Sequence, residues 1–232
     1  MKVEIITLFP EFFNGIFNHS ILKRAIDNEA LEYIIHDLRD YTTDKHHQAD
    51  DFRFGGGAGM LLKPEPLFAV LREIVDNVKP RPLVIYPTPQ GIPFSQDIAD
   101  ELSKQSHIIF ICGHYKGIDQ RVVDRWVDRE YSIGDYVLTG GEIAVTAMID
   151  AAIRMKPGVL GDIDTARSGS FRNNFLDCPH FTRPEELDGL RVPGVLMSGH
   201  HLNIETWRRI TSEFLTKRRR KDLLTDSNTI QG

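Results

Sequence analysis

The sequence has little cysteine and no long apolar run. Its two cysteines, Cys112 and Cys178, lack the paired spacing of a disulfide framework or a cysteine zinc site. No apolar run approaches the roughly 20 residues that cross a bilayer. The first residues, Met1 to Phe9, lack the long apolar core and cleavage region of a secretory signal. We therefore expect a cytoplasmic protein with two reduced thiols.

Two common nucleotide-binding motifs are missing as well. A Rossmann domain places Gly-x-Gly-x-x-Gly after an early strand, but the first predicted strand here leads into Thr7 to Glu11. The Gly-x-x-x-x-Gly-Lys-Ser/Thr loop that cradles phosphates is also absent from the sequence. An NAD-dependent oxidoreductase is therefore disfavoured, and it stays open only as a third alternative.

The composition is that of a globular protein, with 41% hydrophobic and 26% charged residues. A net charge of -5 argues against a uniformly basic nucleic-acid-binding protein. Positive charge is concentrated locally, however, in the run Lys217 to Lys221 and in Arg208 and Arg209 before it. The run is either a solvated helix end, favoured by the helix dipole, or a surface for phosphate contact.

Short β-branched and aromatic runs alternate with amphipathic segments in the first part of the chain. The runs predict strands, and the segments between them predict helices, one of them capped by Ser95. Such alternation indicates an α/β fold with a parallel sheet covered by helices. The predicted strands are Val3 to Phe9, Tyr33 to Ile35, Leu83 to Tyr86, Ile108 to Cys112 and Tyr131 to Ile133, and the predicted helices are Ser20 to Asn28, Pro64 to Asp76, Ser95 to Lys104 and Asp119 to Trp126.

The remainder of the chain predicts a second, smaller domain. Gly141 to Met155 forms a further predicted helix, which Pro157 and Gly158 end. A polar stretch follows, and apolar residues then fall on one helical face over Asn203 to Lys217. We predict a domain over residues 1–160, a linker over 161–175 and a small, mainly helical domain over 176–232.

Three glycine-rich loops follow successive predicted strands: Tyr86 to Gly91, Cys112 to Asp119 and Ile133 to Glu142. Ligands of open parallel sheets bind beyond the carboxyl ends of the strands, where such loops bring backbone donors close to them. A single glycine-rich loop needs no ligand to explain it, because a tight connection between a strand and a helix also uses glycine. Three together predict a ligand site, and we expect an adenosine-bearing cofactor at the third loop, which opens a helix.

Five motifs in a fixed order give the chain a specific resemblance. They are Glu4 to Pro10, Gly55 to Met60, Cys112 to Asp119, Ser132 to Glu142 and Phe181 to Pro184. With these motifs the sequence resembles, over nearly its full length, the bacterial tRNA (guanine-N1)-methyltransferase family of the SPOUT superfamily.

The resemblance implies a fold, a cofactor and an oligomeric state. SPOUT enzymes contain a deep trefoil knot near the carboxyl-terminal part of the sheet, and the three loops would hold S-adenosylmethionine there. It also implies a homodimer, in which each site uses the knot of one subunit and the linker and C-terminal domain of the other. The cofactor-binding residues carried over are Tyr86, Thr88, Pro89, Gly91, Gly113, Tyr115, Gly117, Ile133, Gly134, Asp135, Tyr136, Val137, Leu138, Gly140 and Gly141.

The implied reaction methylates N1 of the guanosine at position 37 of tRNA, immediately 3′ of the anticodon. N1 carries a proton at neutral pH, so the reaction needs a general base and a cation for the charge that grows on O6. The resemblance makes Arg154 the catalytic arginine and Ser170 a substrate contact, but it puts Gly169 at the position of the base. Glycine accepts no proton. Either the chain binds cofactor and RNA with impaired catalysis, or a nearby carboxylate substitutes: Asp162, Asp164 or Asp177.

Metal binding is not predicted. The family is associated with magnesium, but Lys116 stands where some members have an acidic residue, and Gly169 also lacks a carboxylate. We therefore name no metal ligand, although Mg²⁺ stays open. The histidines and aspartates of His46 to Asp51 fit no common metal motif. By resemblance, Asp50 and Gly55 to Gly59 form a lid near the target guanosine.

Overall fold

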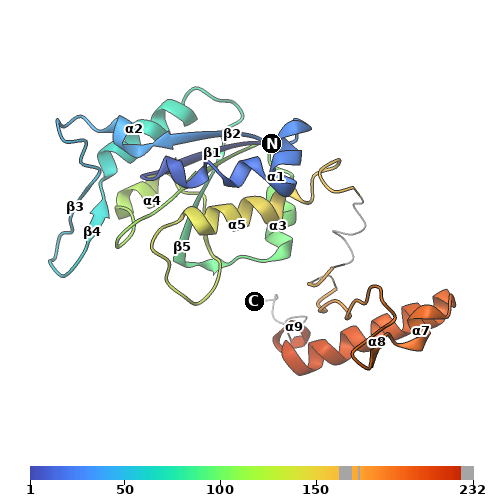
Figure 1. The fold of residues 1–232 in the computed structure, drawn as a ribbon. Coiled ribbons are helices and arrows are strands. Elements are labelled where there is room, and N and C mark those ends of the chain that lie inside the picture. The colour runs from blue at the N-terminus through green and yellow to red at the C-terminus, as the bar shows by residue number, and fades with distance from the viewer. Residues whose placement is uncertain (162–168, 172, 226–232) are drawn as a thin grey trace. The chain divides into compact units, whose positions relative to one another are not determined.

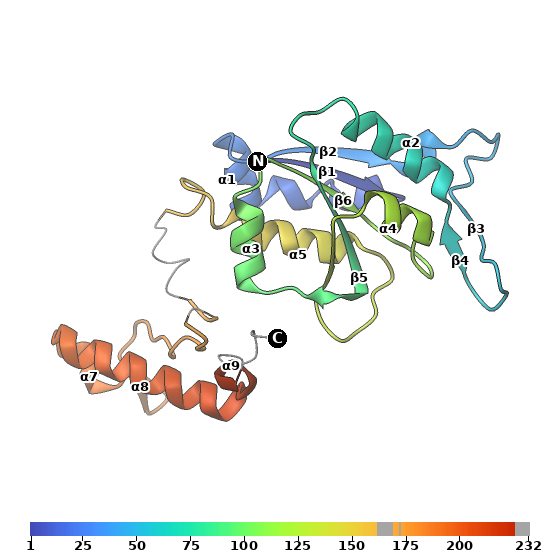
Figure 2. The same ribbon diagram turned by 180° about the vertical axis from the view of Figure 1, so that it is seen from behind.

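A computed structural model describes residues 1–161, 169–171 and 173–225. The chain divides into two compact units, Met1–Ile163 and Asp164–Gly232, which Figure 1 and Figure 2 show from opposite sides. Two of the carboxylates considered as a substitute base, Asp162 and Asp164, lie outside the described residues.

The first unit is built on a five-stranded sheet in the order β2-β1-β6-β5-β7. Every neighbouring pair is parallel, which confirms the predicted mixed α/β class. Parallel sheets are covered on both faces, so their strands are apolar along most of their length. The strands are β1 (Lys2–Thr7), β2 (Glu32–Asp37), β5 (Leu83–Pro93), β6 (His107–Ile111) and β7 (Arg129–Ser132).

Helices cover both faces of this sheet. On one face, α1 (Ser20–Asp27), α3 (Gln96–Ser103) and α5 (Glu142–Ile153) pack into one hydrophobic cluster with the sheet. On the other, α2 (Pro64–Val75) and α4 (Gln120–Trp126) pack into a second cluster. All five helices were predicted.

Ser95 caps the amino end of α3, as predicted. Its Oγ accepts a hydrogen bond from the backbone N–H of Ile98, with a donor–acceptor distance of 3.4 Å. A bond of this kind satisfies one of the N–H groups that the first turn of a helix leaves without a partner.

The sequence did not predict the short elements of this unit. The 3-10 helices η1 (Pro10–Phe13), η2 (Ile16–Asn18) and η3 (Leu38–Tyr41) fall between predicted segments. Strands β3 (Asp50–Phe52) and β4 (Met60–Leu62) form an antiparallel hairpin. Elements of three or four residues show too few periods of hydrophobic alternation to be recognised.

Strand β5 extends beyond its predicted end at Tyr86. The pairing of β5 with β7 is irregular between Pro87 and Ile92, after which it resumes with Ile92 opposite Tyr131. The first glycine-rich loop therefore lies within a distorted strand, because the distortion frees Thr88 to Gly91 from the ladder.

A carboxylate is buried within the sheet. Glu4 on β1 is 3% exposed and accepts hydrogen bonds from Nζ of Lys2 at 2.7 Å, Nε2 of His36 at 2.5 Å and Nε2 of His107 at 2.9 Å. Burial alone raises the pKa of the Glu4 carboxyl, but the bonds from His36 and Lys2 outweigh it and lower the pKa to about 2. Glu4 is therefore an ionised group of the core.

Helices are the main regular elements among the described residues of the second unit. It contains α7 (Gly194–Met197), α8 (His201–Arg219), α9 (Asp222–Thr225) and a hairpin of β8 (Glu186–Leu187) and β9 (Leu190–Arg191). Leu176 is held on α8 at both backbone groups: its N–H donates to Oγ1 of Thr216 at 2.9 Å, and its carbonyl accepts from Oγ of Ser212 at 2.5 Å. In the described part of the chain, no helix is long and apolar enough to cross a membrane.

Candidate functional site

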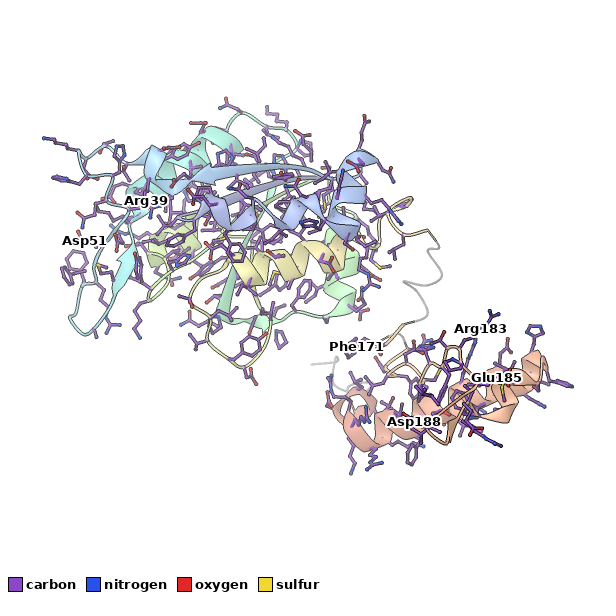
Figure 3. The ribbon with its side chains drawn as sticks, viewed as in Figure 1. Arg39, Asp51, Phe171, Arg183, Glu185 and Asp188 are labelled. Atoms are coloured by element: carbon purple, nitrogen blue, oxygen red, sulfur yellow. The ribbon has the colours of Figure 1, made fainter. Side chains whose placement is uncertain are left out.

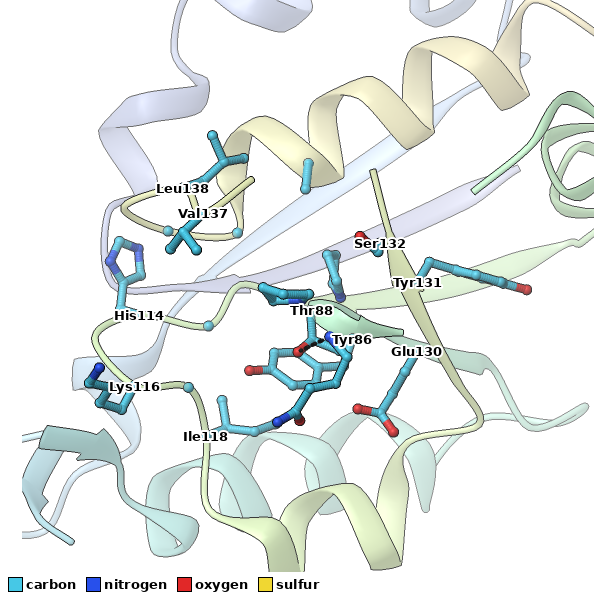
Figure 4. Close-up of a pocket in the computed structure, with 18 of the residues that line it drawn as sticks. Tyr86, Thr88, His114, Lys116, Ile118, Glu130, Tyr131, Ser132, Val137 and Leu138 are labelled. Atoms are coloured by element: carbon cyan, nitrogen blue, oxygen red, sulfur yellow. Dashed lines mark hydrogen bonds between the residues drawn. The ribbon is translucent and has the colours of Figure 1, made fainter. Parts of the chain in front are cut away.

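A cavity of about 490 Å³ lies at the carboxyl ends of β5, β6 and β7 (Figure 4). Its walls come from all three glycine-rich loops, which are separate segments of the sequence between Tyr86 and Glu142 but converge here because their strands are neighbours. Cavities of roughly 300–1,000 Å³ are typical of small-molecule sites. The convergence of the three loops is the arrangement that the sequence predicted.

Most of the predicted cofactor residues line this cavity. From the first loop these are Tyr86, Thr88 and Pro89, and from the second Gly113, Tyr115 and Gly117. From the third they are Ile133, Gly134, Tyr136, Val137, Leu138, Gly140 and Gly141.

Two predicted cofactor residues do not line the cavity. Gly91 lies against β7, where a Cβ atom would collide with the backbone of Glu130 and Tyr131. A glycine is required at this position because β5 and β7 pack closely there. Asp135 is on the third loop, and it is exposed.

The second and third loops are joined by their backbones. The N–H of Gly141 donates to the carbonyl of Gly113 at 2.9 Å, and His114 and Gly140 form an isolated antiparallel bridge. A Cβ atom at Gly141 would lie 2.8 Å from Cα of Cys112, which is closer than such atoms approach in proteins. The absence of a side chain at Gly141 therefore lets the two loops meet.

Side chains add a second connection, centred on Glu142. Its carboxylate is 4% exposed and accepts hydrogen bonds from Oγ1 of Thr7 at 2.6 Å and from Nε2 of His114 at 2.8 and 2.9 Å. The ring of His114 also packs on the ring of Phe9, with centroids 4.8 Å apart. Glu142 thus links the end of β1, the second loop and the start of α5.

The sequence does not predict this pairing of side chains. His114 lines the cavity and Glu142 begins α5, and in the sequence each is only one residue within a longer motif. The available signal was a carboxylate directly after two glycines at a helix start, with a histidine in the loop before it.

Tyr86 forms part of the cavity wall. Its side chain is mostly buried, and burial raises the pKa of its hydroxyl despite hydrogen bonds involving Thr88 and the backbone of Ile118. Tyr86 is therefore a neutral, polar-tipped wall residue. Cys112, the first residue of the second loop, is buried, and burial raises the pKa of its thiol well above the ordinary value, so the thiol stays protonated and is not a nucleophile.

Arg154 lies away from the cavity within its own chain. It is the exposed residue at the carboxyl end of α5, whereas the cavity adjoins the amino end of this helix at Gly141. With a rise of about 1.5 Å per residue, twelve residues separate the two ends by about 18 Å. A single chain therefore does not bring Arg154 to its own cavity wall.

The other predicted catalytic positions belong to the second unit. Among the described residues, no atom lies within 4 Å of the place that a Cβ of Gly169 would occupy. Oγ of Ser170 accepts a hydrogen bond from the N–H of Asp177 at 2.9 Å.

Asp177 is the one substitute base among the described residues. Its carboxylate bonds to Nε2 of His180 at 2.9 Å and to the N–H of Cys178 at 2.7 Å. Partial burial raises the pKa of Asp177, but these bonds outweigh it and lower the pKa below its usual range. Asp177 is therefore an ionised proton acceptor, already paired with a histidine.

One group of side chains in the described part of the chain has ligand atoms close enough for a metal. The ligand atoms of Asp177, Cys178 and His180 lie within 4.8 Å of one another. The ion pair between Asp177 and His180 accounts for much of this proximity. The residues of His46 to Asp51 form no comparable group among the described residues.

Comparisons with known proteins give the family. Residues 1–226 match the family model described as tRNA (Guanine-1)-methyltransferase TrmD. Proteins named tRNA (guanine-N(1)-)-methyltransferase are similar to this chain over 97% of its length. Those from Brevibacillus brevis and Staphylococcus haemolyticus are 48% and 50% identical over 224 residues, which is 91% of each relative. The relative from Bacillus cereus strain AH820 is 47% identical over 92% of its length.

The oxidoreductase alternative is therefore wrong. The chain belongs to the tRNA (guanine-1)-methyltransferase TrmD family.

Proposed function

We propose that this protein transfers a methyl group from S-adenosylmethionine to N1 of the guanosine at position 37 of tRNA. The observation that carries the proposal is the cavity formed by three loops at the strand ends of a member of this family. The cofactor supplies an electrophilic methyl group on its sulfonium. Every other task falls to residues of the protein and consists mainly of holding the two reactants in line.

The cavity walls fit such a cofactor. Gly113 and Gly117 lie beside the ring and hydroxyl of Tyr86, where added Cβ atoms would fill the space in front of the wall. The backbone of Tyr136 to Leu138 offers amide and carbonyl groups that can read an adenine edge. Space and backbone donors thus occur together, as a nucleoside requires.

Arg154 and a carboxylate would act on the guanine. Arg154 offsets the negative charge that develops on O6 as the N1 proton leaves. With Gly169 unable to accept that proton, Asp177 is the described carboxylate that could do so, since it is ionised and its N–H contacts Ser170. The second candidate function, cofactor and RNA binding with impaired catalysis, is favoured by Gly169 alone.

The proposal includes a homodimer. Arg154 and the cavity lie at opposite ends of α5, so a second copy of the chain is needed to bring an arginine to each cavity. The exposed side of α5 is suited to contact, because Ile143 is 52% exposed next to the cavity residue Ala144. We also propose that the three loops form the deep trefoil knot of the SPOUT superfamily.

The basic run Lys217 to Lys221 would bind tRNA phosphates. Lys217, Arg218 and Arg219 end α8, and Arg220 pairs with Asp222 at 2.6 Å and lies over the ring of Phe171. Phosphate contacts of this kind are independent of sequence and weaken with salt. A tRNA substrate would place the protein in the cytoplasm. No magnesium site is proposed, since Lys116 and Gly169 supply no carboxylate.

Methyl transfer tests the reaction directly. The protein would be incubated with labelled S-adenosylmethionine and a tRNA with guanosine at position 37, and 1-methylguanosine would be measured by mass spectrometry. The matched control is the same tRNA with adenosine at position 37. Product on the guanosine tRNA alone supports the proposal, whereas product on neither, with binding of S-adenosylhomocysteine intact, supports the impaired enzyme.

Gly169→Asp separates the two candidate functions. The position is open and its backbone has no left-handed strain, so the substitution is accommodated. Equal activity of Gly169→Asp and the unsubstituted protein shows that another base works. Activity in Gly169→Asp alone shows that the chain is a binding protein that has lost its base.

Mixed dimers test the shared site. Arg154→Ala and Gly113→Val would each be inactive alone, the second because a side chain there meets Tyr86. If each site combines one subunit's cavity with the partner's arginine, a mixed dimer contains one complete site and regains activity. Without such recovery, with both variants folded by their melting curves, the shared site is refuted.

A further inference from the structure

The β3–β4 hairpin exposes two aromatic rings. Phe52 is 82% exposed and Phe54 is 99% exposed, the largest values for any described phenylalanine. Figure 3 shows Asp51 on this hairpin, where it projects from the body of the unit. Exposed large apolar side chains that are gathered in one place, rather than scattered singly, mark interaction sites.

The tip of this hairpin has a defined shape. Gly55, Gly56, Gly57 and Gly59 have φ angles of 82°, 74°, 91° and 94°, which side chains other than glycine rarely adopt. Nε of Arg53 donates to the carbonyl of Gly56 at 2.8 Å, so the guanidinium folds across the tip, against Gly57. Phe54 has no such partner within the described residues and stands free beside it.

The hairpin is attached to the wall of the cavity. The N–H of Leu62 donates to the carbonyl of Gly117 at 3.0 Å, and the N–H of Lys116 donates to the carbonyl of Met60 at 3.1 Å. The aliphatic carbons of Lys116 lie against Gly59, and both Leu61 and Lys116 line the cavity. The hairpin therefore continues the cavity rim.

The chemistry of a tRNA substrate indicates which groups would contact these phenylalanine rings. N1 lies on the Watson–Crick edge of guanine, so the target base must be unpaired and turned out of its stack before methylation. Its neighbours then lose a stacking partner. Aromatic side chains replace such partners in proteins that bind single-stranded RNA, and nearby cations such as Arg53 and Lys116 attract the phosphates.

We propose that Phe54, supported by Phe52, is a stacking platform for an unpaired tRNA base next to the target guanosine. The inference rests on the proposed function for its choice of RNA. A second copy of the chain is the competing occupant of the rings. RNA is favoured because the same hairpin carries the cation Arg53 and because its β4 strand bonds to Lys116 at the rim of the cavity that would receive the target base.

The test compares Phe54→Leu with Phe54→Trp. Leucine keeps the apolar character and removes the ring, whereas tryptophan keeps an aromatic face. Binding would be measured on an anticodon stem-loop with 2-aminopurine beside the target guanosine, whose fluorescence reports stacking without any methyl transfer. Loss of one base–aromatic stack weakens binding by about 5-fold to 140-fold.

We expect Phe54→Leu to weaken stem-loop binding by that factor and to abolish the fluorescence change. Phe54→Trp should restore both, and the affinity of either variant for S-adenosylhomocysteine should be unchanged. Binding of Phe54→Leu within twofold of the unsubstituted protein overturns the inference. Loss of the oligomer by Phe54→Leu in sedimentation also overturns it, because the rings would then contact a second copy of the chain instead of RNA. An unsubstituted protein that binds and quenches the stem-loop but forms no 1-methylguanosine refutes only the proposed reaction.

Discussion

Glu142 should be needed both for stability and for cofactor binding, and Glu142→Gln tests this. The carboxylate accepts hydrogen bonds from two donors, Oγ1 of Thr7 and Nε2 of His114, whose one N–H is shared between the two carboxylate oxygens, and it has almost no exposure to water. The amide of glutamine has one acceptor oxygen, so its NH₂ group faces a donor. Hydrogen bonds to charged groups contribute about 1.5–3 kcal/mol each. We therefore expect a loss of about 2–4 kcal/mol of unfolding free energy.

The same substitution should weaken S-adenosylhomocysteine binding at least about tenfold, since about 1.4 kcal/mol corresponds to a factor of ten. The reason is that Glu142 holds the second loop to the start of α5, and both line the cavity. Glu4→Gln is the matched control, because Glu4 is an equally buried carboxylate bonded to histidines but does not line the cavity.

Urea unfolding and isothermal calorimetry would measure the two quantities on the same preparations. Both variants should be less stable, and only Glu142→Gln should bind S-adenosylhomocysteine more weakly. Equal affinities in the two variants would refute the reasoning, because the Glu142 bonds would then stabilise the fold without shaping the cavity.

Three further results are expected. The pKa of Glu4 is about 2, against an ordinary 4.5. Its ionised form therefore adds about 3 kcal/mol to the free energy of unfolding above pH 4.5, and this contribution is lost as the pH falls toward 2. In urea unfolding at a series of pH values, the stability difference between the unsubstituted protein and Glu4→Gln should shrink below pH 4.5. Burial raises the pKa of the Cys112 and Cys178 thiols, so a thiol reagent at pH 7.5 should label neither until denaturant is added. Gly141→Ala should lower the melting temperature and weaken S-adenosylhomocysteine binding, because its Cβ meets the backbone of Cys112. Gly161→Ala should change neither, because no atom of the described residues lies within 4 Å of its Cβ position.

The regular elements of the first unit could be predicted from the sequence, because their signals are local. Each predicted strand overlaps an observed strand of the sheet, and the helix predicted over Gly141 to Met155 is α5 with slightly shorter ends. Strand order was not predictable in this way, since β1 lies between β2 and β6 only through long-range pairing. The hairpin at Phe52 was missed because its strands are three residues long.

The candidate site was predicted in its loops but not in its internal connections. The sequence motifs predict both Gly91 and Gly141 as cofactor-binding residues. In the structure, only Gly141 lines the cavity, whereas Gly91 packs against the backbone of β7. The pairing of His114 with Glu142 joins two loops whose contact depends on the whole fold. By contrast, the position of Arg154 at the far end of α5 from Gly141 follows already from the helix predicted over Gly141 to Met155.

The bond between Thr7 and Glu142 has a consequence for biosynthesis. It joins residues 135 positions apart, so the cavity is incomplete until more than half of the chain has been made. Contacts of such long range form late and slow folding, because the intervening chain must first be ordered. A nascent chain that ends before α5 should therefore have no cofactor site, and S-adenosylmethionine can stabilise the protein only after the first unit is complete.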